Sequence, residues 1–155
     1  MSTVWILVSD AARGRLFETN DAPDAWTEVT CYTNPELRGL AQQGRPEHTL
    51  PLTQDSTGPG RHVIEPHTSR KDKSAQAFAH MIVSDLREAR VHHRYDSLLL
   101  IAPPHFLGIL RAQLGDLDAA GVAGELDNDV VSMPETELRS YISKAFPEVF
   151  HAWRA

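Results

Sequence analysis

Apolar and polar residues follow one another in short blocks over the first 33 positions. The apolar run Val4–Val8 predicts a buried strand, and Asp10–Gly14 supplies residues typical of a turn. Arg15–Thr19 resumes an extended pattern, so these runs predict a hairpin. Trp26–Thr33 alternates as a half-exposed third strand would, with one face predicted to carry Trp26, Glu28, Thr30 and Tyr32. The chain therefore opens as a three-stranded meander.

The middle of the chain carries the clearest helical pattern. Spacings of three and four predict one amphipathic helix from about Lys71 to His92, with an apolar stripe formed by Ala75, Phe78, Ala79, Ile82, Leu86 and Ala89. Ser69-x-x-Asp72 fits a capping box at its start. Ser97–Ala102 has no polar alternation after its first residue, which is typical of a central strand covered on both faces.

Proline and glycine divide the remaining elements. Pro104 predicts the first turn of a second helix, and Gly115 predicts its end. Gly121–Asp127 indicates a further strand. A second capping box, Ser132-x-x-Glu135, predicts a third helix that ends before Pro147.

The elements follow the order β-β-β-α-β-α-β-α. Three antiparallel strands followed by crossover units predict a mixed five-stranded sheet with packed helices, in the α/β class. At 155 residues, the chain is expected to form a single domain, 1–155. The order suits a ribonuclease H-like sheet, which is also the architecture of the middle domain of eukaryotic and archaeal peptide-chain release factors.

A segment without periodicity separates the meander from the first helix. Residues 38–67 are rich in proline and glycine and predict a long flexible surface loop. Loops of this length in a compact domain usually serve a function. The exit of the loop, Gly58-Pro-Gly-Arg-His62, is therefore a candidate functional tip.

Composition and charge narrow the classes of function. The chain is 41% apolar, and its formal net charge of −6 opposes a broad grip on nucleic acid while leaving room for a local basic patch. The lone Cys31 cannot form an internal disulfide. The run Val4–Val8 has no basic leader and is shorter than a signal peptide core or a membrane span. We therefore expect a cytoplasmic protein that does not enter the membrane, and no pattern indicates a cofactor.

Four pieces of the sequence, taken in order, resemble one family. They are Trp5–Glu18, Gly60-Arg-His62 with Glu65-Pro66, Ile101–Arg111, and Glu125–Asp129 followed by Pro134-x-x-x-Leu138. This combination resembles the bacterial host attachment protein family, placed among bacterial and archaeal relatives of the release-factor middle domain. The resemblance covers essentially the whole chain and implies such a domain standing alone.

The resemblance also limits the activity that it implies. In release factors, the loop before the long helix carries a Gly-Gly-Gln tip that enters the ribosomal peptidyl-transferase centre. The corresponding stretch here, Gly58–His62, has no glutamine and no paired glycines. Peptidyl-tRNA hydrolysis is therefore not implied. The family name refers to attachment to host cells, a phenotype that a cytoplasmic protein would affect indirectly.

Basic residues concentrate at the loop exit and the helix start. The candidate contacts to RNA, the ribosome or a protein partner are Gly60, Arg61, His62, Arg70, Lys71 and Lys73. Lysine and arginine bind phosphates, whereas cations near a helix N-terminus slightly disfavour the helix. The segment thus indicates a role other than stability. The leading hypothesis is a non-enzymatic binding module.

A metal-dependent hydrolase is the first alternative. Asp10, Glu125, Asp127 and Asp129 fall near the ends of predicted strands, where ribonuclease H-type nucleases bind two metal ions. Asp10 also lies in a predicted hairpin turn, where aspartate commonly serves local hydrogen bonding. The loop histidines match no compact ligand motif, so we expect no metal site at His48, His62, Glu65 and His67.

A protein–protein adaptor in an attachment pathway is the second alternative. The aromatic tail with Phe150 and Trp153 is expected to pack either on the body or on a partner.

Overall fold

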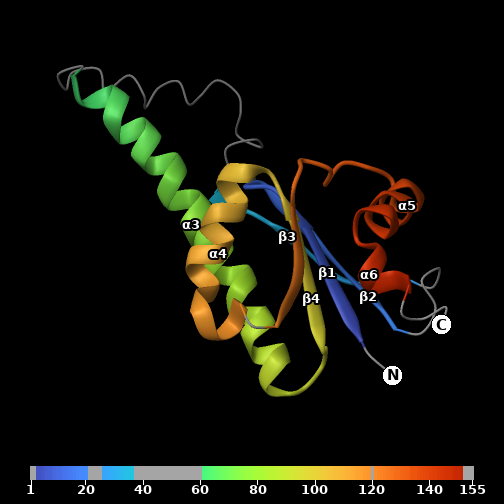
Figure 1. The fold of residues 1–155 in the computed structure, drawn as a ribbon. Helices are drawn as coiled ribbons and strands as arrows, with labels where there is room; N and C mark the ends of the chain where they lie inside the picture. Colours follow the sequence, from blue (N-terminus) through green and yellow to red (C-terminus); the bar gives the residue numbers. More distant parts are fainter. Residues whose placement is uncertain (1–2, 21–25, 37–60, 120, 152–155) are drawn as a thin grey trace.

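A mixed sheet forms the centre of the protein. The computed structural model describes residues 3–20, 26–36, 61–119 and 121–151. Its strands are β1 Val4–Ser9, β2 Arg13–Thr19, β3 Thr27–Thr33, β4 Ser97–Ala102 and β5 Val122–Asp127. They lie side by side in the order β3-β2-β1-β4-β5 (Figure 1).

Two kinds of strand pairing meet at β1. It runs antiparallel to β2, with Ile6 opposite Phe17, and parallel to β4, with Ile6 opposite Leu99. β2 and β3 are also antiparallel, whereas β4 and β5 are parallel. The predicted mixed five-stranded α/β sheet is therefore confirmed. The central strands β1 and β4 have buried residues on both faces, which explains their uninterrupted apolar sequences.

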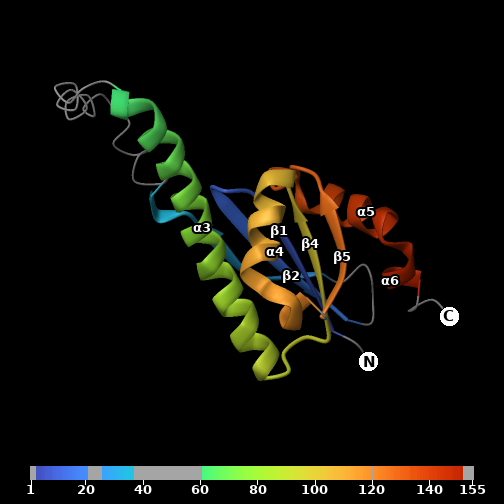
Figure 2. The same cartoon turned by 60° about the vertical axis from the view of Figure 1, so that its left-hand side comes forward.

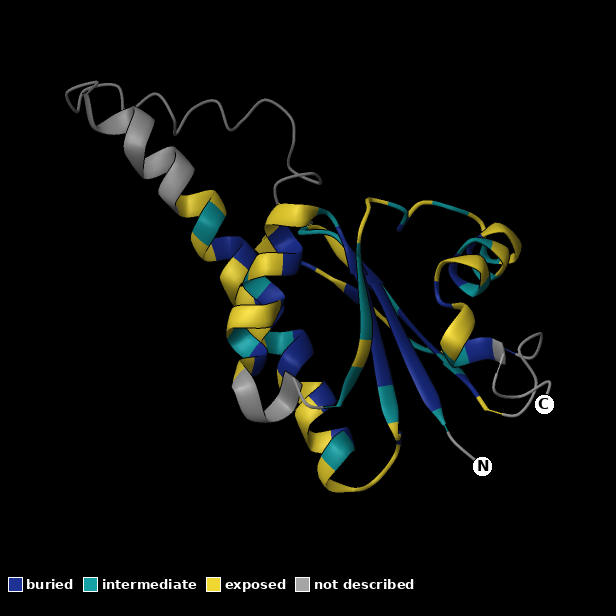
Figure 3. Ribbon diagram, in the orientation of Figure 1, coloured by how far each residue is buried: buried dark blue, intermediate teal, exposed yellow. Residues whose placement is uncertain are grey.

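Helices cover both faces of this sheet. Within the described residues they are α3 Arg61–Val91, α4 Pro104–Ala119, α5 Glu135–Ala145 and α6 Pro147–His151. α3 and α4 lie on one face, and α5 and α6 lie on the other (Figures 1 and 2). Each face has its own apolar core, the first including Trp5, Leu7, Phe78, Ile82 and Leu86 and the second including Ile6, Phe17, Leu138, Ile142 and Phe150. Buried residues accordingly line the sheet and the inner sides of the helices (Figure 3).

The long helix α3 begins earlier than its sequence pattern predicts. It is already helical at Arg61, so residues 61–67 do not belong to a loop, and the predicted start near Lys71 is wrong. Ser69 and Asp72 lie inside the helix and do not form a capping box. A box of that kind caps the free N–H groups of a first turn, which at Ser69 are already engaged in the helix. The predicted loop residues 38–60 lie outside the described residues.

The end of α3 is defined by a left-handed residue. His93 has φ 55°, its N–H donates to the carbonyl of Arg90 at 2.9 Å, and the N–H of Arg94 donates to Ala89 at 2.9 Å. This pattern is a Schellman motif, which satisfies free carbonyls of the last turn. It turns the chain back toward the sheet, so the side chain of Arg94 is placed beside β1.

Two predicted helix boundaries have different outcomes. Gly115 has φ 72° and ψ 177°, so it interrupts the helical conformation of α4 as expected. The capping box at Ser132 is wrong, because Pro134 precedes α5 and no side chain caps it. The hydroxyl of Ser132 instead accepts a hydrogen bond of 2.6 Å from Arg13, across the end of the sheet.

An irregularity in β3 changes which side chains share a face. The pairing with β2 shifts between Leu16 and Phe17, so Val29 is an extra residue between the partners Glu28 and Thr30. Such a bulge reverses the alternation. Tyr32 therefore packs in the core under α3, whereas Trp26 packs in the opposite core. The predicted single face from Trp26 to Tyr32 is wrong for this reason.

Candidate functional site

The predicted basic residues lie along the first part of α3. Arg70, Lys71 and Lys73 are exposed, and the helix extends beyond the edge of the sheet at this end (Figures 1 and 2). Arg61 and His62 form the first turn of α3, but their side chains lie outside the described residues, as does all of Gly60. The structure thus arranges the basic segment on a helix rather than on a loop tip.

The helix is held to the body just after this segment. The side chain of Asn34, which follows β3 and is 3% exposed, donates to the hydroxyl of Ser74 at 3.0 Å. From Ser74 onward the apolar stripe of α3 is buried, beginning with Ala75 and Phe78. The basic side chains of Arg70, Lys71 and Lys73 come before this buried stripe and are exposed.

A groove between α3 and α4 lies next to the basic segment. It has a volume of about 580 Å³, and its lining includes Gln76, His105 and Gln113. His105 of α4 lies 3.5 Å from the carboxylate of Asp72 on α3. Amide and imidazole groups in this groove can exchange hydrogen bonds with a ligand held by the neighbouring cations.

The carboxylates considered for metal chemistry serve other contacts. Asp10 accepts backbone N–H hydrogen bonds from Ala12 at 2.8 Å and from Arg13 at 2.9 Å, as expected for an aspartate in a turn. Glu125 binds Arg111 at 2.6 Å, and this hydrogen bond, followed by the charge of Glu125, raises the pKa of the guanidinium.

The remaining candidate ligands do not gather into a cluster. Asp127 and Asp129 are exposed. Among the described residues, no group of three or more His, Cys, Asp or Glu side chains could hold a metal ion. His48 and the side chains of His62, Glu65 and His67 lie outside the description. The geometry therefore gives no support to a two-metal site at these strand ends.

The aromatic tail packs on the body of the protein. Phe150 is 2% exposed, and its ring stacks on Trp26 with a centroid distance of 6.2 Å. Trp153 lies outside the described residues. The described part of the tail thus completes the core under α5 and α6 and leaves no exposed ring at Phe150 for a partner.

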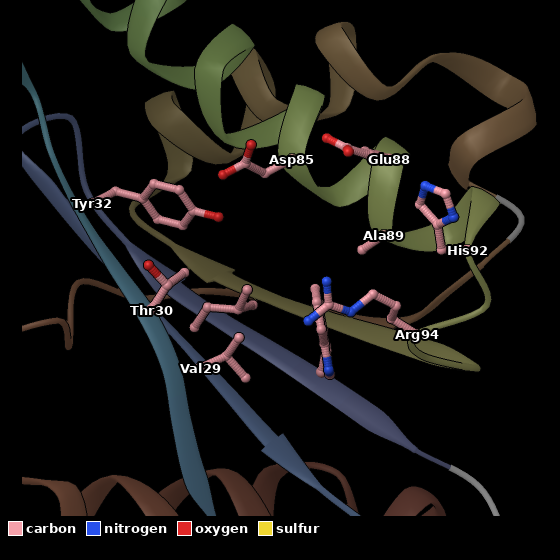
Figure 4. A pocket seen from close by; sticks show the side chains of 10 residues that line it. Val29, Thr30, Tyr32, Asp85, Glu88, Ala89, His92 and Arg94 are labelled. Carbon is pink, nitrogen blue, oxygen red and sulfur yellow. The ribbon is translucent and has the colours of Figure 1, made fainter.

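A cavity between β3 and the last turns of α3 has no counterpart in the sequence predictions. Its volume is about 240 Å³, and it lies between the sheet residues Trp5, Leu16 and Tyr32 and the helix residues Asp85 and Glu88. Figure 4 shows the Tyr32 hydroxyl directed at the Asp85 carboxylate, while Arg94, which follows the last turn of α3, extends its guanidinium into the cavity.

Burial and charge act together on Tyr32. Its side chain is 8% exposed, and its hydroxyl faces the carboxylate of Asp85 (Figure 4). Burial, followed by the charge of Asp85 and the approach of its carboxylate to the hydroxyl, raises the pKa of Tyr32 above its ordinary value. The protonated form of the phenol is therefore favoured next to the carboxylate of Asp85.

Stacked rings support the opposite side of the cavity. The guanidinium of Arg94 lies 5.9 Å from the ring centroid of Trp5, which stacks on Tyr95 at 4.9 Å. The hydroxyl of Tyr95 donates to the carbonyl of Leu86 at 3.0 Å. The ring of Trp5 therefore contacts both Arg94 and Tyr95.

Sequence reasoning missed this cavity because its residues come from three strands, the helix α3 and the segment that follows it. Asp85, Glu88 and His92 do share a side of α3 at spacings of three and four, next to the apolar stripe. That spacing was the only available signal. The pairing of Tyr32 with Asp85 depends on the bulge in β3, which no sequence pattern indicates.

None of the helices in the described residues is long and apolar enough to cross a membrane.

Comparison with known proteins identifies the family. A family model described as "protein required for attachment to host cells" matches residues 5–142, which span all five strands and most of α5. No curated protein matches the chain. Because the match covers most of the chain, the resemblance seen in the sequence is confirmed, and this protein belongs to the host attachment protein family.

Proposed function

We propose that this protein acts by binding rather than by catalysis, and that it contacts ribosomal RNA through the basic first part of α3. The observation that carries the proposal is the exposure of Arg70, Lys71 and Lys73 on a helix that extends past the sheet. The chain as a whole carries a formal charge of −6, which repels RNA. Binding to RNA phosphates therefore requires a local concentration of cations such as this segment.

The surroundings of the basic segment suit RNA. Residues 61–73 contain four Lys and Arg residues against two carboxylates, so the segment is locally positive. The groove lined by Gln76, His105 and Gln113 offers neutral hydrogen-bonding groups next to it. Cations that hold phosphates, together with polar groups that contact bases or riboses, are a usual combination in RNA-binding sites.

The arrangement of the sheet also favours a release-factor-like body. Three antiparallel strands followed by two parallel ones, in the order β3-β2-β1-β4-β5, agree with the ribonuclease H-like expectation. The long helix after the meander corresponds to the helix that follows the catalytic tip in release factors. The tip sequence itself is absent here, so the proposal includes ribosome contact without peptide release.

The family description suggests a role in attachment to host cells. We propose that the protein influences attachment indirectly, from the cytoplasm, through its contact with the ribosome.

Co-sedimentation with purified ribosomes over a series of salt concentrations tests this function. We expect wild-type protein to sediment at low salt and to be released as salt rises. Lys73→Gln and Arg61→Ala should each weaken binding. Each should also reduce the magnitude of the slope of log K against log salt concentration by about 1. Both variants should keep the wild-type melting temperature.

Lys144→Gln is the matched control. Lys144 is an exposed lysine in the last turn of α5, on the opposite face of the sheet, and its loss changes the net charge by the same amount. Absence of sedimentation at low salt, or equal losses for Lys73→Gln and Lys144→Gln, would refute ribosome contact through α3.

A further inference from the structure

We propose that the cavity between β3 and the last turns of α3 binds a small zwitterion of amino-acid size, with its ammonium group at Asp85 and its carboxylate at Arg94. This site lies at the opposite end of α3 from the basic segment. It is therefore independent of the proposed RNA contact.

The cavity presents opposite charges on opposite sides of an apolar surface. Asp85 stands on α3, and Arg94 follows the Schellman motif at the end of that helix (Figure 4). The lining also includes the ring of Trp5 and the side chain of Leu16, which are 4% and 1% exposed. An amino acid carries the same arrangement, two opposite charges attached to a compact carbon skeleton.

Both charged groups are exposed, lie beside an aromatic side chain of the sheet and retain capacity for a ligand. The Tyr32 hydroxyl faces the carboxylate of Asp85 (Figure 4), and a carboxylate can accept several hydrogen bonds from a ligand. Arg94 rests on the face of Trp5, and no carboxylate pairs with its guanidinium in the part of the chain that the structure describes. A guanidinium forms two parallel hydrogen bonds with a ligand carboxylate.

The remaining polar groups add selectivity. Glu88 and His92 line the cavity from exposed positions of α3, and Thr30 adds a hydroxyl from β3 (Figure 4). The two carboxylates of Asp85 and Glu88 stand against the one guanidinium of Arg94, which disfavours purely anionic ligands. The volume of about 240 Å³ falls below the roughly 300–1,000 Å³ typical of drug-sized ligands and suits a small metabolite.

Thermal shift of the full chain against the standard L-amino acids at millimolar concentration is the first experiment. We expect at least one of them to raise the melting temperature in a saturable way. That amino acid is then titrated into ¹⁵N-labelled protein beside the corresponding amine, which lacks the carboxylate, and the corresponding carboxylic acid, which lacks the ammonium. The indole N–H of Trp5 and the amide of Arg94 report on the cavity.

The amino acid should bind at least about tenfold more tightly than either analogue, because each analogue loses one charge-assisted interaction. Asp85→Asn keeps an acceptor for Tyr32, and it should raise the dissociation constant at least about tenfold, as should Arg94→Gln. The matched controls Asp129→Asn and Lys144→Gln, at exposed positions elsewhere, should leave it unchanged.

Three results would overturn the proposal: no saturable shift with any amino acid, equal affinity for an analogue that lacks one charge, or equal effects of the cavity and control variants. Ribosome binding is measured separately through Lys73→Gln. Failure of one proposal therefore leaves the other standing.

Discussion

At the scale of single residues, the absence of a side chain at Gly124 in β5 permits a close contact. Of the described glycines, Gly124 leaves the least space for a Cβ atom. A Cβ atom at this position would lie 2.5 Å from Cε1 and 2.8 Å from Cδ1 of Phe146, and 3.3 Å from Leu99. The missing side chain thus makes room for the ring that joins α5 and α6 to the sheet.

Replacing Gly124 by alanine should therefore destabilise the fold. We expect Gly124→Ala to lower the free energy of unfolding by about 1–3 kcal/mol, the usual cost of overpacking a core. Urea denaturation provides the measurement. Gly108→Ala is the control, because nothing lies within 4 Å of a Cβ at that exposed helical position. That variant should be neutral or gain up to about 1 kcal/mol from helix propensity, and similar losses in both variants would contradict the steric account.

Tyr32 makes the free energy of unfolding depend on pH in the alkaline range. Its pKa is raised in the folded state, so the folded protein binds the phenolic proton more tightly than the unfolded chain does. The associated stability is fully present below the ordinary tyrosine pKa of about 10 and is lost as pH rises above it. We expect the free energy of unfolding of the wild type to fall between pH 9 and 11, and Tyr32→Phe to show a smaller fall. Parallel curves for the two proteins would contradict this assignment.

At the scale of elements, only part of the helix α3 was predictable from local sequence. Its amphipathic part was predictable from spacing, because residues that face a core recur every three or four positions. Its start at Arg61 was not, because Pro66 and the polar residues before Lys71 carry no helical pattern.

Asn34 is the main polar tie between the meander and α3. Its amide donates to the carbonyl of Ala11 and to the hydroxyl of Ser74, each at 3.0 Å, and its own oxygen accepts from the N–H of Glu36 at 3.1 Å. Asn34→Ala should cost about 1–3 kcal/mol, because the buried partners lose their hydrogen bonds. We also expect faster amide hydrogen exchange around Ser74.

The exposed substitution Ser84→Ala, on the same helix, provides the control for Asn34→Ala. If exchange near Ser74 remained at the wild-type rate in Asn34→Ala, this tie would not be what holds the helix at that point.

At the scale of the whole molecule, one sheet separates two cores. Ile82 packs under α3 and Ile142 packs under α5, and both are fully buried. We expect Ile82→Val and Ile142→Val each to cost about 0.5–1.5 kcal/mol. Since the two sites share no packing partners, the double variant should equal the sum of the singles within about 0.5 kcal/mol. Chemical denaturation of all four proteins measures the coupling, and a larger coupling would show that the sheet transmits strain between the cores.

The sequence alone determined the class of fold and nearly every element. β4 was predicted with its observed bounds, and the other strands within a few residues, because burial on one or both faces imposes a local periodicity. The order of the elements then constrained the sheet to a mixed topology, since parallel strands require crossover helices. The family was also recognisable from the sequence, because its motifs are short, local stretches of residues.

Tertiary structure decided what local periodicity does not encode. The bulge at Val29 placed Tyr32 under α3, and the Schellman motif at His93 directed Arg94 to the same cavity. Ser69 and Ser132 have the spacing of capping residues, but Ser69 lies inside α3 rather than at its start, and the hydroxyl of Ser132 accepts a hydrogen bond from Arg13. A cavity lined by β1, β2, β3 and α3 exists only after distant segments pack together, so its residues carry no common spacing along the chain.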